Sequence, residues 1–242
     1  MINNRKFNFF IDFDGTITKQ DIGETIIKNY GDPEEINRII EKWAKHEITS
    51  AESWYLFIDL MINYTQSSIN NLLDTIDIDL YFLEFINFTK KHNFPILVLS
   101  DGWDYYIKYF FNKYNIDIPF YANKINFDNN NKIKISFPYK DDECNLCGNC
   151  KRNHLLLNSA DDEREYTVYI GDGLSDRCPI LYVDFIFAKG SLLKYLETNR
   201  ISYYPFTNFK DVLNILEGLL AKKKLKKRHQ ALLNRKKFYL EG

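Results

Sequence analysis

Residues 7–18, FNFFIDFDGTIT, decide the fold that the sequence predicts. The stretch opens with near-continuous apolar residues, the pattern of a strand buried on both faces as in a parallel sheet. Two carboxylates follow, Asp12 and Asp14, spaced so that both point to the same face of the strand. Their like charges repel each other unless a cation or a proton lies between them.

The place of this aspartate pair in the chain predicts a metal site. In open α/β sheets, the crevice that binds ligands lies at the carboxyl ends of the strands. A divalent ion bound there would stabilise Asp12 and Asp14 side by side. The alternative is a loop in which the two aspartates only cap nearby backbone groups.

The composition indicates a globular chain with one large domain, or with a core domain and a smaller insertion. Its 242 residues are 45% hydrophobic and 16% aromatic, enough to bury a sizeable core. No run reaches the roughly 18 apolar residues of a membrane span. The N-terminus leads straight into the first strand, so we expect a cytoplasmic protein without a signal peptide. The four cysteines do not suggest a secreted disulfide framework.

The net charge of −1 conceals a basic C-terminal tail, which we place at residues 221–242. Residues 222–242 hold nine Lys or Arg and one Glu. Such a run can contact RNA, an anionic membrane surface or an acidic partner. Without residues that read or stack on bases, it is more typical of a solvated, partly helical extension, and we do not expect nucleic-acid binding.

Residues 20–93 predict a helical cap inserted after the first strand, which leaves 1–19 and 94–220 for the core domain. Apolar residues recur at helical spacing through this segment. Asp32 before Pro33 and the sequence TSAE at 49–52 are helix start signals.

A second buried strand, at residues 96–99, ends at Ser100. The Ser100 hydroxyl, followed by the backbone N–H groups of Asp101 and Gly102, suits a phosphate oxygen, although a serine is also ordinary at a strand end. We expect the Asp101 side chain to turn away and cap the helix at residues 104–114.

Three cysteines at C-x2-C-x2-C spacing, Cys144, Cys147 and Cys150, could hold zinc. A closed zinc site needs a fourth ligand, for which His154 and Cys178 are the candidates. The favoured alternative is a set of thiols packed around a tight turn at residues 148–149.

Lys151 follows the last of these cysteines and begins a helix at residues 151–160. A centre that contains Asp12, Asp14 and a phosphate dianion needs positive charge beyond one divalent ion, and Lys151 could supply it. Lys140 and Arg152 are the nearby alternatives.

A strand at residues 166–170 leads into the sequence GDGLSD, residues 171–176. Asp172 in this tight loop could bind a metal ion directly. Asp176 could order a metal-bound water or fix Lys151. Strands and helices then alternate up to residue 220, which predicts a Rossmann-like parallel sheet with helices on both faces, an α/β fold.

Taken together, DFDGT at residues 12–16, Ser100, Lys151 and GDGLSD resemble the four signatures of the haloacid-dehalogenase-like (HAD) hydrolase superfamily, in the same order. The resemblance covers residues 7–220 and is to the phosphoserine-phosphatase-like branch. The run of cysteines ending in Cys-Lys is similar to the methionine-salvage 2-hydroxy-3-keto-5-methylthiopentenyl-1-phosphate phosphatases, and to phosphoethanolamine/phosphocholine phosphatases.

The resemblance implies a HAD core with a C1-type helical cap, and an Mg²⁺-dependent phosphoric monoester hydrolase. Asp12 would be the nucleophile that forms an aspartyl-phosphate, and Asp14 the general acid and base. The other implied roles are Mg²⁺ binding by Asp12, Asp172 and the Asp14 main-chain carbonyl, phosphate binding by Ser100, Gly102 and Lys151, and substrate contact by Glu24. Asp21 and Glu24 could equally favour a helix N-terminus through its dipole.

The substrate implied is a small phosphorylated metabolite. 2-Hydroxy-3-keto-5-methylthiopentenyl 1-phosphate is the type substrate, but this chain has His46 and Ala51 where those relatives have Gly and Arg. Phosphoserine, phosphocholine and phosphoethanolamine therefore remain alternatives. A reading of another class is a non-catalytic binding protein that acts through the basic tail.

Overall fold

The computed structural model describes residues 5–144, 146–159 and 164–241. In chain order, its helices and strands are β1 (Lys6–Ile11), α1 (Ile22–Tyr30), α2 (Pro33–Ala44), α3 (Ser50–Leu60), α4 (Gln66–Asp74), α5 (Tyr81–His92), β2 (Ile96–Trp103), α6 (Asp104–Lys113), β3 (Phe120–Phe127), β4 (Ile133–Ser136), α7 (Lys151–Leu157), β5 (Glu165–Gly171), the short 3₁₀ helices η1 (Leu174–Asp176) and η2 (Pro179–Tyr182), β6 (Phe185–Ala188), α8 (Gly190–Thr198), β7 (Tyr204–Pro205), α9 (Phe209–Ala221) and α10 (His229–Glu241).

The chain divides into two compact units. The first unit comprises Met1–Asp12, Asp79–Val98 and Lys151–Gly242. The second unit comprises Phe13–Ile78 and Leu99–Cys150. The boundaries that the sequence predicts between cap and core stay a prediction.

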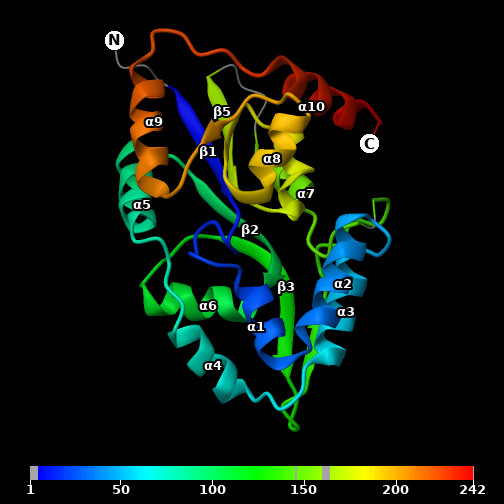
Figure 1. The fold of residues 1–242 in the computed structure, drawn as a ribbon. Coiled ribbons are helices and arrows are strands. Elements are labelled where there is room, and N and C mark those ends of the chain that lie inside the picture. Colours follow the sequence, from blue (N-terminus) through cyan, green and yellow to red (C-terminus); the bar gives the residue numbers. More distant parts are fainter. Residues whose placement is uncertain (1–4, 145, 160–163, 242) are drawn as a thin grey trace. The chain divides into compact units, whose positions relative to one another are not determined.

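A parallel sheet forms the centre of the first unit, with its strands in the order β2-β1-β5-β6-β7. Ile11 of β1 lies between Val98 of β2 and Ile170 of β5. Helices α5 and α9 cover one face of this sheet, and α7 and α8 cover the other (Figure 1). Every residue of β5 is buried, including the strand predicted at residues 166–170. The predicted Rossmann-like parallel sheet is therefore confirmed.

Aromatic side chains hold α5 and α9 together on the sheet. The ring of Phe209 lies 4.9 Å from that of Phe82 and 5.2 Å from that of Phe85, measured between centroids. Phe85 also makes an edge contact with Phe9 of β1, at 5.0 Å. Such contacts stabilise a helix beyond the area it buries. Helix α5, although its sequence falls within residues 20–93, is thus part of the first unit.

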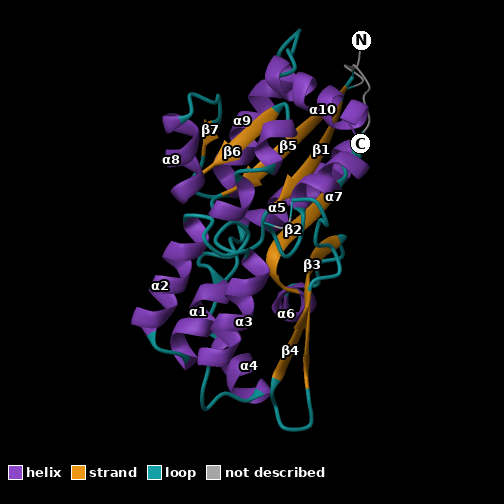
Figure 2. Ribbon diagram, turned by 90° about the vertical axis from the view of Figure 1, so that its right-hand side faces the viewer, coloured by secondary structure: helices purple, strands orange, loops and turns teal. Residues whose placement is uncertain are grey.

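The second unit contains helices α1 to α4 and α6 and a hairpin of β3 and β4 (Figure 2). Asp32 caps α2 ahead of Pro33, and Thr49 and Glu52 form a capping box at α3, as the sequence predicts. The hairpin is antiparallel, with Ile125 opposite Ile135. These local signals determine where the elements of this unit begin.

The basic tail ends in a helix, α10, whose inner side is anchored on the first unit. Arg235 is only 7% exposed and forms an ion pair with Asp184 at 3.2 Å. The Arg228 guanidinium donates to the carbonyl of Val183 at 2.9 Å, and the Tyr239 hydroxyl to that of Leu156 at 3.0 Å. The tail therefore differs from a fully solvated extension. None of the described helices is long and apolar enough to cross a bilayer.

Candidate active site

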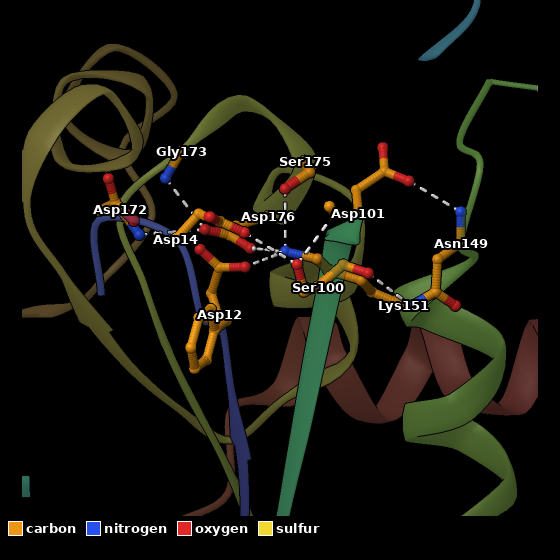
Figure 3. Close-up of polar contacts among 12 residues, drawn as sticks. Asp12, Asp14, Ser100, Asp101, Asn149, Lys151, Asp172, Gly173, Ser175 and Asp176 are labelled. Atoms are coloured by element: carbon orange, nitrogen blue, oxygen red, sulfur yellow. Dashed lines mark hydrogen bonds and ion pairs between the residues drawn. The ribbon is translucent and has the colours of Figure 1, made fainter. Parts of the chain in front are cut away.

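Lys151, the first residue of α7, is the centre of a buried charged cluster in the first unit (Figure 3). Its ammonium group donates to Asp12 Oδ1 at 2.5 Å, to Asp176 Oδ1 at 2.8 Å and to Ser175 Oγ at 2.8 Å. The side chains of Lys151 and Asp176 are almost completely shielded from solvent. All three N–H donors of the lysine therefore have partners inside the protein.

The sheet places the carboxylates of this cluster. Asp12 follows β1 and Asp172 follows β5, and these strands are adjacent and parallel. Asp176 turns back over the loop, where its Oδ2 accepts from the backbone N–H of Asp172 at 3.0 Å and of Gly173 at 2.9 Å. A Cβ at Gly171 would lie 2.4 Å from that oxygen, so only glycine permits the turn. We call Asp12, Lys151, Asp172 and Asp176 the Lys151 cluster.

Opposing effects act on the protonation of Lys151. Burial by itself lowers the pKa of the ammonium group, but Asp12 and Asp176 outweigh burial through their charges and hydrogen bonds and raise the pKa above its usual range. Lys151 therefore stays charged and offsets part of the negative charge around it. The Tyr169 hydroxyl also donates to Asp176, at 2.6 Å. Burial, followed by the negative charge of Asp176, raises the pKa of Tyr169 well above its usual value.

The Lys151 cluster can hold a divalent cation. Asp12, Asp172 and Asp176 each offer an oxygen, and these oxygens lie within 4.8 Å of one another. Three carboxylates beside one lysine leave excess negative charge, and hard oxygen ligands suit Mg²⁺. Both oxygens of Asp176 already accept hydrogen bonds from Lys151, Tyr169 and the loop backbone. Asp12 and Asp172, which directly follow the adjacent strands β1 and β5, are the candidates for direct ligands.

Asp14, in the second unit, accepts hydrogen bonds on both carboxylate oxygens. The hydroxyls of Ser100 and Tyr106 donate to Oδ2 at 2.9 and 2.8 Å. The amides of Ile22 and Gly23, at the start of α1, donate to Oδ1 at 3.2 and 3.4 Å. Burial raises the pKa of Asp14, and these hydrogen bonds, with that from Tyr106 first, act in the opposite direction.

Ser100, Gly102 and Tyr106 form a compact surround for this carboxylate. The Gly102 amide donates to Ser100 Oγ at 2.9 Å. A Cβ at Gly102 would lie 1.5 Å from the Tyr106 hydroxyl, so the phenol occupies the space that any side chain at this position would need. Burial, followed by the charge of Asp14, raises the pKa of Tyr106 well above its usual value. We call Asp14, Ser100, Gly102 and Tyr106 the Asp14 cluster.

The expected role of Asp101 as a helix cap is wrong. Helix α6 has no side-chain cap, and Asp101 lies within β2, which continues to Trp103. Its buried carboxylate accepts from the Ser50 hydroxyl at 2.5 Å. It also accepts from the backbone N–H of Asn149 at 2.8 Å, the contact marked by a dashed line in Figure 3. These tertiary partners, which no local pattern reveals, determine its orientation.

The side chain of Glu24 makes no hydrogen bond or ion pair with the carboxylate of Asp14. It lies on α1, is about half exposed, and pairs with Lys28 at 2.5 Å. Asp21 is the N-cap of the same helix and accepts from the Glu24 amide at 2.7 Å. Asp21 thus acts at the N-terminus of the helix, which was the alternative to contact with the substrate. The substrate-contact role of Glu24 stays a prediction.

The zinc prediction receives no support. Among the residues that the structure describes, the group with metal-ligand geometry is made of carboxylates and includes no cysteine. All four cysteines are thiols rather than disulfide partners. Hydrogen bonds of the backbone organise the loop instead: the Cys144 N–H donates to Asp141 Oδ1 at 2.6 Å, and the Cys150 N–H to the Tyr139 carbonyl at 2.9 Å.

Three residues at these clusters were not predicted from the sequence: Ser175 and Tyr169, which bond to the Lys151 cluster, and Tyr106 of the Asp14 cluster. Ser175 lies inside the GDGLSD motif and could have been found there, because it is the hydroxyl nearest in sequence to Asp176. Tyr169 lies between Val168 and Ile170 in the fully buried β5, and Tyr106 lies in the first turn of α6, four residues after Gly102. Neither tyrosine carries a sequence signal that separates it from an ordinary core residue.

The sequence of the chain matches a known family. The family described as "Putative Phosphatase" matches residues 8–191 of this chain, about three quarters of its length. The chain belongs to this phosphatase family. A curated relative, the 2-hydroxy-3-keto-5-methylthiopentenyl-1-phosphate phosphatase of Bacillus cereus strain ATCC 10987 / NRS 248, is 33% identical over 217 residues, which cover 88% of this chain and 97% of the relative. The Bacillus mycoides strain KBAB4 enzyme of the same name is 31% identical over the same coverage.

Solved structures of phosphoserine phosphatase share the fold. The structure of a phospho-aspartyl intermediate analogue of that enzyme has a TM-score of 0.63 and 17% identity, over 88% of this chain and 98% of the other. The substrate-bound complex has a TM-score of 0.64 and 17% identity, over 87% and 98%. The HAD fold and the class of phosphoric monoester hydrolase, both predicted from the sequence, are confirmed for this family member.

Proposed function

We propose that this chain hydrolyses a small phosphomonoester with Asp12 as the nucleophile and an aspartyl-phosphate as the intermediate. The observation that carries the proposal is the buried Lys151 ammonium, which lies 2.5 Å from Asp12 Oδ1. A fixed positive charge at a nucleophilic carboxylate offsets the repulsion between that carboxylate and a phosphate dianion. It also stabilises the charge that collects on the phosphoryl oxygens in the transition state.

In the proposed first step, a carboxylate oxygen of Asp12 bonds to phosphorus while the bond from phosphorus to the leaving oxygen breaks. Asp14 gives its proton to that leaving oxygen. In the second step Asp14 takes a proton from the water that attacks phosphorus, and phosphate leaves Asp12. Only Phe13 separates Asp12 from Asp14 in the chain, and the raised pKa of Asp14 favours its acid role.

The proposed phosphate ligands are Ser100, the Gly102 amide and Lys151. The Ser100 hydroxyl and the Gly102 amide already lie together, at 2.9 Å, in the second unit. Ser100 follows Val98 by two residues, and Val98 pairs with Ile11, which directly precedes Asp12. The order of the signature residues along the chain, which matches that of the superfamily, supports a role for both clusters in one reaction.

We propose Mg²⁺ as the cofactor, held by the carboxylates of Asp12 and Asp172, with the Asp14 main-chain carbonyl as a predicted further ligand. When bound, the ion would neutralise part of the charge of the phosphoryl group. The oxygen-only donor set of the Lys151 cluster supports this choice. Asp176 would hold Lys151 and the Asp172 loop in place, because its oxygens bond to both.

For the substrate, we propose 2-hydroxy-3-keto-5-methylthiopentenyl 1-phosphate, which would place the enzyme in methionine salvage and in the cytoplasm. The support is the name shared by the Bacillus relatives at 31 and 33% identity, which align over 97% of their length. Phosphoserine, phosphocholine and phosphoethanolamine are the competing substrates.

The test is a phosphate-release assay with Mg²⁺ over a panel of these four compounds, on the wild type and on Asp12→Asn. We expect hydrolysis by the wild type, fastest with the methionine-salvage substrate, and a loss of at least about 1,000-fold in the variant, because the nucleophile is removed. Asp77→Asn, which alters a carboxylate 64% exposed, is the matched control and should retain activity. A wild type that releases no phosphate from any compound would refute the proposal.

A further inference from the structure

The Tyr106 phenol is the one hydroxyl at Asp14 to which neither the family resemblance nor the proposed reaction gives a role. The side chain is completely buried, and its hydroxyl lies 2.8 Å from Asp14 Oδ2. Its ring stacks on Phe13 at 6.0 Å and contacts Trp103 at 6.1 Å, between centroids. Neighbours on several sides thus hold the hydroxyl in one place, against the Asp14 carboxylate.

The two oxygens of Asp14 have different kinds of partner. Oδ1 accepts from the amides of Ile22 and Gly23, which can only donate. Oδ2 faces the hydroxyls of Ser100 and Tyr106, which can donate to a carboxylate and accept from a carboxylic acid. A carboxyl group that alternates between acid and base must carry its proton on an oxygen with such partners. That oxygen is Oδ2.

The proposed function gives the two hydroxyls different roles when the substrate is bound. In the proposed function, the Ser100 hydroxyl and the Gly102 amide turn to the phosphate. Ser100 then leaves Oδ2, whereas Tyr106 has no role in phosphate binding. Tyr106 is therefore the partner that remains on the proton-bearing oxygen of Asp14 while the substrate is bound.

We propose that Tyr106 is a positioning residue, which holds Oδ2 of Asp14 in the orientation that delivers its proton to the leaving oxygen. The proposal rests on the proposed function, because it takes Asp14 as the general acid. Tyr106 forms and breaks no covalent bond: the proton passes from Asp14 to the leaving oxygen, and later from water to Asp14. The space that the phenol needs also explains why residue 102 is glycine.

The test compares two substrates that differ in their need for a proton. An alkyl phosphate, such as the best compound of the panel above, needs the proton because an alkoxide is a poor leaving group. p-Nitrophenyl phosphate releases a stabilised phenolate and needs none. We expect Tyr106→Phe to slow the first step, measured as release of the leaving group in a single turnover, by about 10- to 100-fold on the alkyl phosphate, as expected for weakened general acid catalysis, and by less than about threefold on p-nitrophenyl phosphate.

The matched control is Tyr109→Phe. Tyr109 lies on the same helix and also donates to a carboxylate, that of Asp74, at 2.5 Å. The Tyr109→Phe variant should leave both rates unchanged. The ratio of the two rates in one sample does not depend on how much of the variant is folded, so a folding defect cannot produce the expected result. Asp14→Asn should show the same selectivity in this first step, and adding Tyr106→Phe to it should cause little further loss.

An equal loss on both substrates, or no loss on either, would overturn the role of Tyr106 while the proposed function stands. A wild type inactive on both substrates, or an active Asp12→Asn, would instead refute the proposed function.

Discussion

The Ser50 hydroxyl donates a 2.5 Å hydrogen bond to the carboxylate of Asp101, and both side chains are buried within the second unit. The bond connects the start of α3 to the β2 segment that carries Ser100 and Gly102. On the same residue, the Asp101 carbonyl accepts from Trp54 Nε1 at 2.8 Å. Helix α3 and this end of β2 therefore form one hydrogen-bonded structure.

We predict that Asp101→Asn lowers the free energy of unfolding by about 2–3 kcal/mol. An amide can replace only one of the two carboxylate oxygens as an acceptor. With that oxygen toward the Asn149 backbone N–H, its NH₂ group would face the Ser50 hydroxyl, which would have to turn from donor to acceptor, and both hydrogen bonds would lose the carboxylate charge. Urea denaturation measures the change. Asp59→Asn, at an exposed carboxylate on α3, is the control and should change stability by less than about 0.5 kcal/mol. Equal stabilities of the two variants would show that the hydrogen bonds of the Asp101 carboxylate do not stabilise the protein.

The Lys151 cluster was predictable from the sequence because each of its residues lies next to a pattern that can be recognised there, either a buried strand or a family signature. Asp12 and Asp172 follow buried strands, and the order of the strands in a parallel sheet brings such residues to one edge. Lys151 could be chosen over Arg152 only by its place in a known signature. The structure supports this choice, since the Arg152 guanidinium instead lies over the Phe238 ring at 5.2 Å.

What the sequence could not provide depends on partners far apart in the chain. Asp101 meets Ser50 and Asn149 across about 50 residues, and Tyr106 meets Asp14 across 92. A charge run likewise gives no sign that Arg235 is buried against Asp184 while the lysines around it are exposed. The spacing of apolar residues indicates which face of a helix or strand is buried, but not which polar group lies opposite that face.

The ion pair between Arg235 and Asp184 predicts that the C-terminal helix stabilises the first unit. Among the described residues, Arg235→Ala leaves the buried Asp184 carboxylate with its hydrogen bonds to Thr167 and the charge of the Arg228 guanidinium, without an ion-pair partner in contact, and should lower the free energy of unfolding by about 3–5 kcal/mol. Guanidinium denaturation measures the loss. Lys236→Ala, at the next and exposed position, is the control and should be neutral. A neutral Arg235→Ala would mean that α10 is not anchored as the structure describes.

Burial of His154 on α7 predicts that the free energy of unfolding decreases as the pH falls. Burial lowers the pKa of this imidazole from 6.5 to about 4. As the pH falls, the unfolded chain binds the proton first, so the contribution of His154 is complete above pH 6.5 and declines as the pH falls toward 4.

We therefore expect the wild type to lose about 1–2 kcal/mol more than His154→Gln between pH 7 and pH 5, after allowance for partial solvation. Urea denaturation in EDTA at the two pH values makes the comparison. His229→Gln, at an exposed histidine, should keep the wild-type slope. The same slope in all three proteins would rule out His154 as the source of the acid lability.

Binding of Mg²⁺ by the Lys151 cluster should raise the thermal stability of the protein. A ligand that binds only the folded state adds about 2.7 kcal/mol when its concentration is 100 times Kd. We expect Tm to rise with Mg²⁺ and to fall back with EDTA in the wild type. In Asp172→Asn this rise should be absent or need at least about tenfold more Mg²⁺, since a charged oxygen ligand is lost.

The control, Asp77→Asn, changes an exposed aspartate outside the cluster and should respond to Mg²⁺ as the wild type does. Lys151→Met separates charge from coordination. It removes the ammonium that offsets Asp12 and Asp176, so the variant should be less stable in EDTA and gain more from Mg²⁺ than the wild type. If Mg²⁺ stabilised Asp172→Asn as strongly as the wild type, the metal would have to bind elsewhere, and Asp172 would lose its proposed role.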